Sequence, residues 1–331
     1  MLNGKRSATK HPRHVWVGLI LASMLLANIP QLRPSLAATN ATVRAWLPLA
    51  LTSPGLPGDV PKFKHIFTIV FENTGYLEIL QGDQAPYFQS LAQQYGLAES
   101  YYGIQHPSLP NYLALISGDT FGIDKNCTDC FVDAPTIVDQ LEAAGISWKA
   151  YMESMPAPCF IGNAGSLYKQ KHNPFIYFTT IRDNPARCNR IVPFSEFAAD
   201  LESNTLPSYA WITPNMCNNM HDCAIKIGDA WLQTWVSQIM ASPAWQDHGM
   251  LVITFDEGDL ADDGGCCQYA LGGRLATLVI SPLGKPGYHS RVAYSHYSLL
   301  RTIEDSWKLP PLGKADCNCS LPMADFFAAL R

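Results

Sequence analysis

Short apolar segments alternate with amphipathic ones along most of the chain. Residues 65–71, 209–213 and 250–255 are continuous apolar runs, which predicts strands buried on both faces. Further strands are predicted at 98–102, 148–152 and 275–281, and helices at 87–94, 112–118, 136–144, 230–240 and 298–307. This alternation predicts an α/β fold with three layers, in which helices cover both faces of a mostly parallel central sheet.

The first 38 residues have the three parts of a secretory signal peptide. Four cations and no acid occur in the first 13 residues, an apolar run follows at 15–29, and small residues stand at 35–38. An uncleaved anchor is the alternative, but this run is shorter than the ~20 residues that a spanning helix needs. We expect a secreted or cell-envelope protein with a signal peptide at 1–38, a linker at 39–61 and one catalytic domain at 62–331.

Removal of the signal peptide makes the chain strongly acidic. Residues 1–38 hold five cations and no acid, so the formal charge changes from −5 to −10. Because phosphate contacts need a basic face, we expect no nucleic-acid partner. No later segment is long and apolar enough to cross a bilayer, so we expect no stable membrane insertion after the signal is removed.

All 10 cysteines lie after the signal peptide, and an even count in an exported chain favours disulfides. A metal site is the alternative, because Cys127 and Cys130 form a CxxC pair. The cysteines are scattered, however, and a zinc site usually needs a second close pair. Connectivity cannot be derived from the sequence. Our working pairs are Cys127 or Cys130 with Cys159, and Cys217 with Cys223.

Polar side chains follow three of the predicted buried strands. Glu72-Asn73 follows the first, Asn215 through Asp222 the second, and Asp256-Glu257 the third. Ligands bind at the carboxyl ends of strands in open α/β sheets, so these clusters can converge on one edge. Converging carboxylates repel one another unless a cation lies between them, and a hard divalent metal is the natural cation.

Ser108, within residues 106–111, stands just before a predicted helix. Free backbone N–H groups and the helix dipole favour an anion at that position, and a phosphate would fit there. A serine hydroxyl is a weak nucleophile, and a base or a metal must activate it. The alternative is that Ser108 only caps the helix.

The segment His106-Pro-Ser-Leu-Pro-Asn-Tyr-Leu-Ala-Leu-Ile-Ser-Gly118 resembles the hallmark of the bacterial phosphoesterase family. This family includes secreted acid phosphatases and phospholipase C enzymes, and it belongs to the alkaline phosphatase superfamily. Residues 71–73, 214–222 with 228–232, 254–258 and 295–298 resemble further segments of the family, in the same order. The resemblance implies an alkaline phosphatase-like fold and a metal-dependent acid phosphatase, a phosphomonoesterase with a phosphoserine intermediate.

The resemblance also implies a metal site. Its ligands would be Glu72, Asn73, Ser108, Asp256 and Glu257. One divalent metal ion of unknown identity is expected. A second is only possible, because this chain has Asn219 where the family often has an aspartate.

Roles in catalysis and substrate binding are carried over in the same way. Ser108 would be the nucleophile, and His221 and His296 would act on the leaving-group side. The expected phosphate-binding or supporting residues are His106, Asn111, Lys171 and His172. Asp222 would orient His221. Asp229 would support the site, although a role as N-cap of the helix at 230–240 explains it better.

The alternatives to a phosphomonoesterase are a phosphodiesterase, a non-catalytic binding protein and a sulfatase. A phospholipase C-type phosphodiesterase would share the same catalytic core, so the substrate is a phosphorylated small molecule or a phospholipid. A non-catalytic envelope binding protein on the same scaffold is disfavoured, because Ser108, Glu72 and Asp256 are all present. A sulfatase is excluded, because no C/S-x-P-x-R segment occurs.

Overall fold

The computed structural model describes residues 59–259 and 264–328. The predicted signal peptide at 1–38 and most of the predicted linker at 39–61 lie outside these residues. Within the described part, nine strands form one sheet in the order β4-β3-β5-β1-β6-β7-β2-β8, and β9 pairs with β2. The strands are β1 (His65–Phe71), β2 (Gly96–Tyr102), β3 (Trp148–Met152), β4 (Ile191–Pro193), β5 (Tyr209–Thr213), β6 (Gly249–Phe255), β7 (Arg274–Ile280), β8 (His289–Ser290) and β9 (Tyr294–Ser295).

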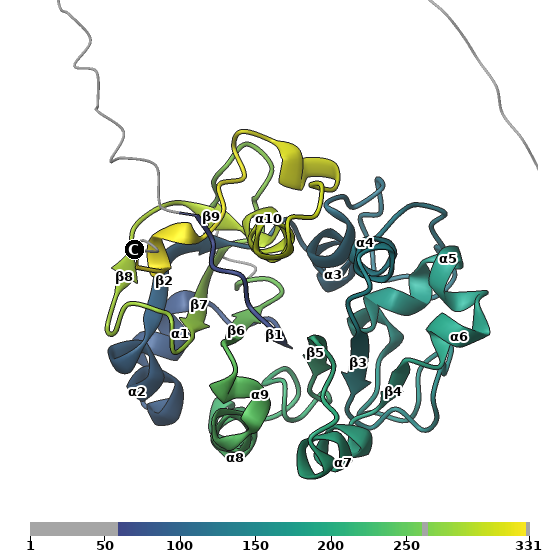
Figure 1. The fold of residues 1–331 in the computed structure, drawn as a ribbon, viewed down its shortest axis with the longest axis horizontal. Coiled ribbons are helices and arrows are strands. Elements are labelled where there is room, and N and C mark those ends of the chain that lie inside the picture. The colour runs from purple at the N-terminus through teal and green to yellow at the C-terminus, as the bar shows by residue number, and fades with distance from the viewer. Residues whose placement is uncertain (1–58, 260–263, 329–331) are drawn as a thin grey trace, which may run out of the picture. The chain divides into compact units, whose positions relative to one another are not determined.

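The helices lie on both sides of this sheet. They are α1 (Tyr76–Gln81), α2 (Pro86–Gln94), α3 (Ser108–Ser117), α4 (Ile137–Ala143), α5 (Thr179–Arg182), α6 (Pro185–Cys188), α7 (Ser195–Ser203), α8 (Ile225–Ala241), α9 (Pro243–Gln246) and α10 (His296–Trp307). Figure 1 shows α3, α4 and α10 on one face, and α7, α8 and α9 on the other. Only β7 runs against its neighbours β6 and β2. The predicted three-layer α/β fold with a mostly parallel sheet is therefore confirmed.

The register of the two central strands decides where the first polar residues come together. β1 and β6 pair in parallel, with Phe71 opposite Phe255. Both strands are almost entirely buried, as continuous apolar runs require. Because the paired strands end at the same level, Glu72 and Asp256 leave the sheet side by side.

Helix α3 is an interior helix, because all ten of its residues are buried. It ends at Gly118, whose φ is +74°. A Cβ at this position would lie 2.1 Å from the carbonyl oxygen of Leu312, so only glycine fits there. The close approach fixes the C-terminal end of α3 and thereby the position of Ser108 at its other end.

Helix α8 begins at Ile225, five residues earlier than predicted, so Asp229 is not its N-cap. Instead, the Asp229 carboxylate accepts hydrogen bonds from the backbone N–H groups of Tyr87 and Phe88, both at 2.9 Å. The predicted role of Asp229 as N-cap of α8 was wrong. Because α2 packs against α8, the N–H groups at the start of α2 are the donors that Asp229 accepts from. Three strands, β4, β8 and β9, were not predicted, since two or three residues are too few to show a periodic pattern.

The structure forms five disulfides within the described residues. They are Cys127–Cys130, Cys159–Cys188, Cys217–Cys223, Cys266–Cys267 and Cys317–Cys319. The predicted Cys217–Cys223 pair is confirmed. The predicted bridge from Cys127 or Cys130 to Cys159 was wrong, because the fold places Cys188 beside Cys159, with a Cα–Cα distance of 5.0 Å. Separately, none of the described helices has the length and apolar character needed to cross a membrane.

Glu304 is a carboxyl group buried in α10, away from the sheet edge. Its Oε1 accepts a hydrogen bond from the Leu312 backbone N–H at 2.8 Å. Burial raises the pKa of Glu304 to about 8, and the contacts with Leu312 and Gln140 offset this only in part. The folded protein therefore holds a proton that the unfolded chain, with an ordinary pKa of 4.5, releases.

This difference predicts a pH-dependent loss of stability. Between pH 4.5 and about 8 the folded state binds more protons than the unfolded state, so Glu304 lowers the free energy of unfolding as pH rises, by up to ~1.4 kcal/mol per pH unit. Glu304→Gln keeps the acceptor for Leu312 and should gain stability over wild type at pH 8 but not at pH 4.5. Urea unfolding at both pH values measures this. The control is Glu202→Gln, at an exposed position of α7. Equal pH profiles for wild type and Glu304→Gln would contradict the prediction for Glu304.

Candidate active site

Three buried carboxylates meet at the carboxyl ends of β1 and β6. Ligand oxygens of Glu72, Asp256 and Glu257 all lie within 4.8 Å of one another. Glu72 and Asp256 are completely inaccessible to solvent, and Glu257 is nearly so. The structure thus brings together the polar clusters that follow two different strands.

Ser108 joins this cluster from the first turn of α3. Its hydroxyl donates to Glu72 Oε1 at 2.5 Å and lies 3.2 Å from Glu257 Oε1. These hydrogen bonds go to side chains of the cluster, while the N-cap position of α3 is taken by Pro107. The Leu109 N–H is capped from outside the helix by Asn126 Oδ1, at 3.0 Å. Ser108 therefore does not act as the helix cap.

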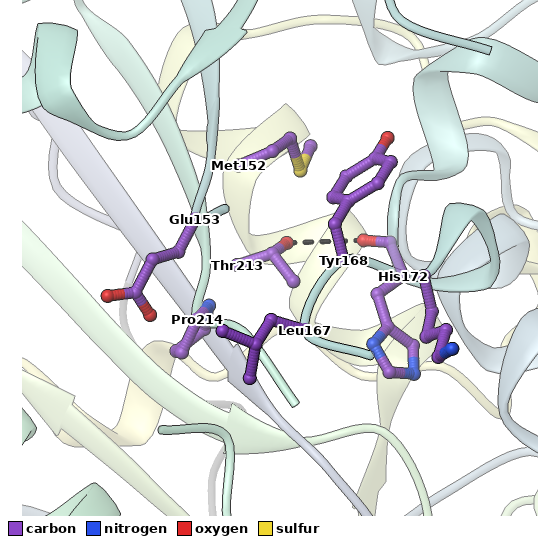
Figure 2. Close-up of a pocket in the computed structure, with 8 residues that line it drawn as sticks. Met152, Glu153, Leu167, Tyr168, His172, Thr213 and Pro214 are labelled. Atoms are coloured by element: carbon purple, nitrogen blue, oxygen red, sulfur yellow. Dashed lines mark hydrogen bonds between the residues drawn. The ribbon is translucent and has the colours of Figure 1, made fainter. Parts of the chain in front are cut away.

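Two cationic or basic side chains reach the same cluster from η1 (Gln170–His172), in the connection between β3 and β4. Lys171 Nζ lies 2.7 Å from Glu72 Oε1 and 3.1 Å from Ser108 Oγ. His172 Nε2 contacts the other oxygen of Glu72. Figure 2 shows His172 beside Thr213, whose hydroxyl donates to the His172 carbonyl at 3.2 Å and ties this turn to the end of β5.

The surroundings shift the pKa values of Glu72 and Asp256 in opposite directions. Burial alone would raise the pKa of Glu72, but His172 and Lys171 outweigh it and lower the pKa to about 2. Burial raises the pKa of Asp256 well above its usual range, and the charges of Glu72 and Glu257 raise it further. Burial lowers the pKa of His172, and the contact with Glu72 opposes that shift only in part. Lys171 then compensates the charge of Glu72.

Asp256 has one oxygen that the described residues leave unsatisfied. Its Oδ1 accepts hydrogen bonds from the backbone N–H groups of Asn73, at 3.0 Å, and Glu257, at 2.7 Å. Its Oδ2 is buried and has no hydrogen-bond partner. A buried carboxylate oxygen in this state is costly, and a bound cation would satisfy it. The acidic triad therefore fits the hard divalent metal expected from the sequence and could hold it.

The turn before α3 is held by side chains predicted to bind phosphate. His106 Nδ1 lies 2.7 Å from Glu257 Oε2. Asn111 Oδ1 accepts from the backbone N–H groups of Ile104 and Gln105, and its Nδ2 donates to the carbonyls of Gln105 and Pro107. Both N–H bonds of the Asn111 amide are thus used within the turn. These contacts fit a residue that supports the turn before Ser108.

His296 contacts the acidic cluster through the backbone of Asp256. It is fully buried, with Nε2 at 2.5 Å from the Asp256 carbonyl oxygen and Nδ1 at 3.1 Å from the Tyr101 hydroxyl. Burial lowers the pKa of His296 to about 4, so the ring is neutral at neutral pH. The pairing of β9 with β2 brings His296 beside Tyr101. Since both ring nitrogens are engaged, its contacts fit a role in positioning Asp256.

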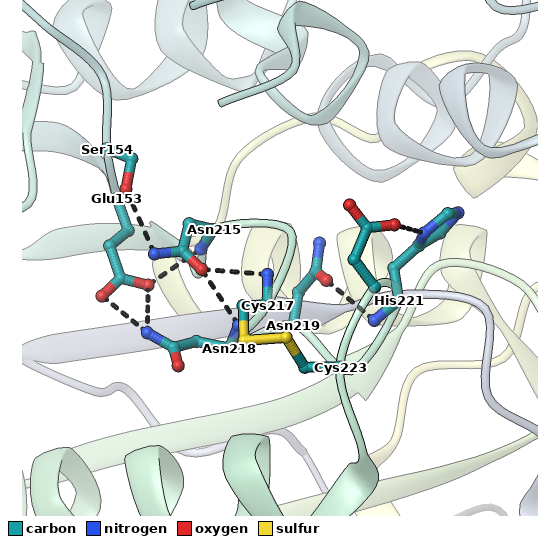
Figure 3. The surroundings of a disulfide bond; sticks show 9 residues. Glu153, Ser154, Asn215, Cys217, Asn218, Asn219, His221 and Cys223 are labelled. Atoms are coloured by element: carbon teal, nitrogen blue, oxygen red, sulfur yellow. Dashed lines mark hydrogen bonds and ion pairs between the residues drawn. A yellow bond between two sulfur atoms is a disulfide. The ribbon is translucent and has the colours of Figure 1, made fainter. Parts of the chain in front are cut away.

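His221 lies at the more open side of the site, with its side chain 30% exposed. Its Nδ1 is 2.6 Å from Asp222 Oδ1, a contact that can orient the ring. Asn219 connects this loop to the carboxylates, because its backbone carbonyl accepts the Glu72 N–H at 3.0 Å and its amide lies 3.4 Å from Glu72 Oε2. Figure 3 shows His221 and Asn219 on the loop closed by Cys217–Cys223.

Two residues near the site were not found from the sequence. Glu153 directly follows β3, so the rule that flagged polar residues after strands would have found it. Tyr101 has no such signal, because it occupies an ordinary position within β2. Asp229 does not join the cluster, since both of its oxygens are used by α2.

Comparisons with known proteins fit this arrangement. The profile of the Phosphoesterase family matches residues 63–310. The chain belongs to this family. It is 30% identical over 317 residues to an acid phosphatase of Aspergillus fumigatus, covering 92% of this chain and 68% of that protein. It is also 30% identical over 319 residues to a phosphatidylinositol-3-phosphatase of Mycobacterium tuberculosis, covering 95% of this chain and 96% of that protein.

A solved structure shows the same fold. A protein in the alkaline phosphatase superfamily from Vibrio parahaemolyticus aligns with a TM-score of 0.53 and 13% identity, covering 76% of this chain and 69% of that one. The chain spans only 62–68% of the length of its fungal acid phosphatase relatives. The predicted family, superfamily fold and enzyme class, a hydrolase of phosphoric esters, are confirmed.

The crowding of carboxyl groups predicts a gain of stability when one of these ionisable groups is removed. Asp256→Asn keeps Oδ1 as the acceptor for Asn73 and Glu257 but removes a buried ionisable group. In chelator-treated protein we expect the free energy of unfolding to rise by about 1–2 kcal/mol. Thermal denaturation with chelator, and again with added divalent metal, measures this. Metal should stabilise wild type but not the variant.

The control is Asp222→Asn, which removes a more exposed carboxylate outside the triad. An equal change in both variants would show that the stability gain does not come from crowding in the triad.

Proposed function

We propose that the protein is a phosphomonoesterase of the acid phosphatase type, with Ser108 as its nucleophile. The observation that carries this proposal is the placement of the Ser108 hydroxyl, at the N-terminus of α3 and in contact with Glu72, Glu257 and Lys171. The helix N-terminus and the Lys171 ammonium both favour an anion next to this hydroxyl. A phosphoryl group bound there would lie against the nucleophile.

We propose Glu72, Asn73, Ser108, Asp256 and Glu257 as the residues that would hold one divalent metal ion. When bound, such an ion would lower the pKa of the serine hydroxyl and neutralise charge on the phosphoryl oxygens. The donor set is rich in oxygen, which suits calcium, magnesium, manganese or iron, while nearby histidines also allow zinc. The described residues contain one acidic cluster of this kind, so we propose a single metal ion.

The chain's own residues provide the remaining parts of the reaction. Ser108 Oγ attacks phosphorus, the bond to the leaving-group oxygen breaks, and a phosphoserine forms. Water then attacks this phosphoserine, which releases phosphate and restores the hydroxyl. Lys171, within 3.1 Å of Ser108 Oγ, would pair with the phosphoryl oxygens, together with His172 and His106. His221, oriented by Asp222, would give a proton to the leaving group.

The substrate and location are part of the same proposal. The relatives named above include an acid phosphatase and a phosphatidylinositol-3-phosphatase, so the substrate class is a phosphorylated small molecule or a phospholipid headgroup. Five disulfides fit an oxidising compartment, and the sequence of residues 1–38 fits an export signal. We propose that the mature protein is secreted or lies in the cell envelope.

Replacing the nucleophile should abolish turnover. Ser108→Ala is expected to lower kcat for an aryl phosphate by about 10³-fold or more, because no other group in the site can form the phosphoserine. The matched control is Ser117→Ala, a buried serine of the same helix whose hydroxyl donates only to nearby backbone carbonyls. Substantial activity of Ser108→Ala in steady-state assays would rule out this mechanism.

Removing the metal should have a similar effect on the unmodified protein. We expect chelator-treated enzyme to lose activity on an aryl phosphate monoester and to regain it with one of the divalent ions named above. The same preparation is assayed on an aryl phosphate diester and on a lysophospholipid. A faster rate on either of these than on the monoester would replace the proposed function by a phospholipase C-type phosphodiesterase. Full activity after chelation would exclude a required metal.

A further inference from the structure

Glu153, the first residue after β3, is surrounded by hydrogen-bond donors. Its Oε2 accepts from the Asn215 backbone N–H at 2.8 Å. The Asn218 amide donates to both of its oxygens, at 2.9 and 3.0 Å, and the Trp231 indole N–H lies 3.2 Å from Oε1. The donors come from the loop after β5 and from α8, so one carboxylate joins three parts of the chain.

The loop that Glu153 holds carries Asn219 and His221, two residues of the site. Asn215 continues the network, because its Oδ1 accepts the backbone N–H groups of Cys217 and Asn218, both at 3.0 Å. The Cys217–Cys223 disulfide closes the rest of the loop. Figure 3 shows Glu153 directed at Asn215 and Asn218, at the opposite end of the loop from His221.

From this loop the contacts pass to the acidic cluster. Asn219 accepts the Glu72 N–H through its carbonyl and the His221 N–H through its side-chain oxygen, both at 3.0 Å. Asn219 thus fixes the backbone of Glu72 and that of His221 at the same time. Met220, between them, has a φ of +76°, and Gly228 of α8 lies against it, since a Cβ there would be 2.5 Å from Met220 Cγ. The conformation is held from outside the loop.

We propose that Glu153 is a positioning residue for the phosphoesterase site, one that holds the 215–223 loop so that Asn219 orients Glu72 and His221 faces the leaving group. This inference rests on the proposed function. Within the part of the chain that the structure describes, the Glu153 carboxylate bonds to Asn215, Asn218 and Trp231 and not to the acidic triad or Ser108, so it acts through the loop. It lies across β5 from β1, in the strand order β3-β5-β1.

The chemistry of the contacts requires a carboxylate at this position. All of its partners are N–H donors, and a carboxylate can accept on both oxygens. Glutamine has nearly the same shape, but one of its ends carries N–H groups. That end would face either the Asn215 N–H or the Trp231 indole N–H, and a donor would meet a donor.

The test uses Glu153→Gln in the full-length protein, with hydrogen exchange and kinetics measured together. We expect amide exchange in residues 215–223 to become at least about 10-fold faster. We expect kcat for an aryl phosphate to fall by about 10–100-fold, with a smaller change in KM and a larger fall for alkyl phosphates, whose leaving groups need a proton more. Apparent affinity for the added divalent metal should weaken as well.

The matched control is Glu142→Gln on α4. Glu142 also accepts an indole N–H, from Trp148 at 3.0 Å, and it pairs with Arg187, but it holds no loop of the site. It should leave exchange in 215–223 and the leaving-group dependence as in wild type. Asn218→Ala, which removes the other partner of the same contact, serves as the second variant if Glu153→Gln does not fold.

The outcomes separate this inference from the proposed function. Unchanged exchange in 215–223, or a loss of kcat that is equal for aryl and alkyl phosphates, would overturn the role of Glu153. Wild-type protein without activity on any phosphate ester would overturn the proposed function, while the exchange data would still report whether Glu153 holds the loop.

Discussion

The site depends on one electrostatic constraint, the burial of three carboxyl groups at adjoining strand ends. Glu72, Asp256 and Glu257 lie within 4.8 Å of one another and have almost no contact with solvent. Such a cluster is stable only when protons, cations or hydrogen-bond donors balance its charge. Lys171 and His172 balance Glu72, whereas Asp256 keeps one oxygen unsatisfied. With this asymmetry the cluster could hold a cation, and the Ser108 hydroxyl lies beside it.

The surrounding fold keeps these groups in place through rigid elements. The register of β1 and β6 brings Glu72 and Asp256 to the same level, and Gly118 anchors the far end of the helix that presents Ser108. The loops are fixed by buried polar contacts, with Asn111 holding the turn before Ser108. A site that stabilises a transition state needs this kind of preorganisation, because each group must be in position before charge develops.

Two histidines that look equivalent in the sequence have different environments. His296 is buried and neutral, with both ring nitrogens engaged by Tyr101 and the Asp256 carbonyl. His221 is partly exposed and is oriented by Asp222. Burial suits a ring that supports the backbone of Asp256, while partial exposure suits proton exchange with a bound molecule. Residue type alone therefore does not decide the role.

The α/β class, the central strands and the polar residues after them could be predicted from local patterns, because buried parallel strands form continuous apolar runs. The sequence also placed Ser108 at a helix start. The folded chain was needed to show that Asp229 caps α2, that Cys159 pairs with Cys188, and that Glu153 bonds to the loop of Asn219. These outcomes depend on which side chains meet across distant segments, and hydrogen bonds between such segments leave no periodic trace in the chain.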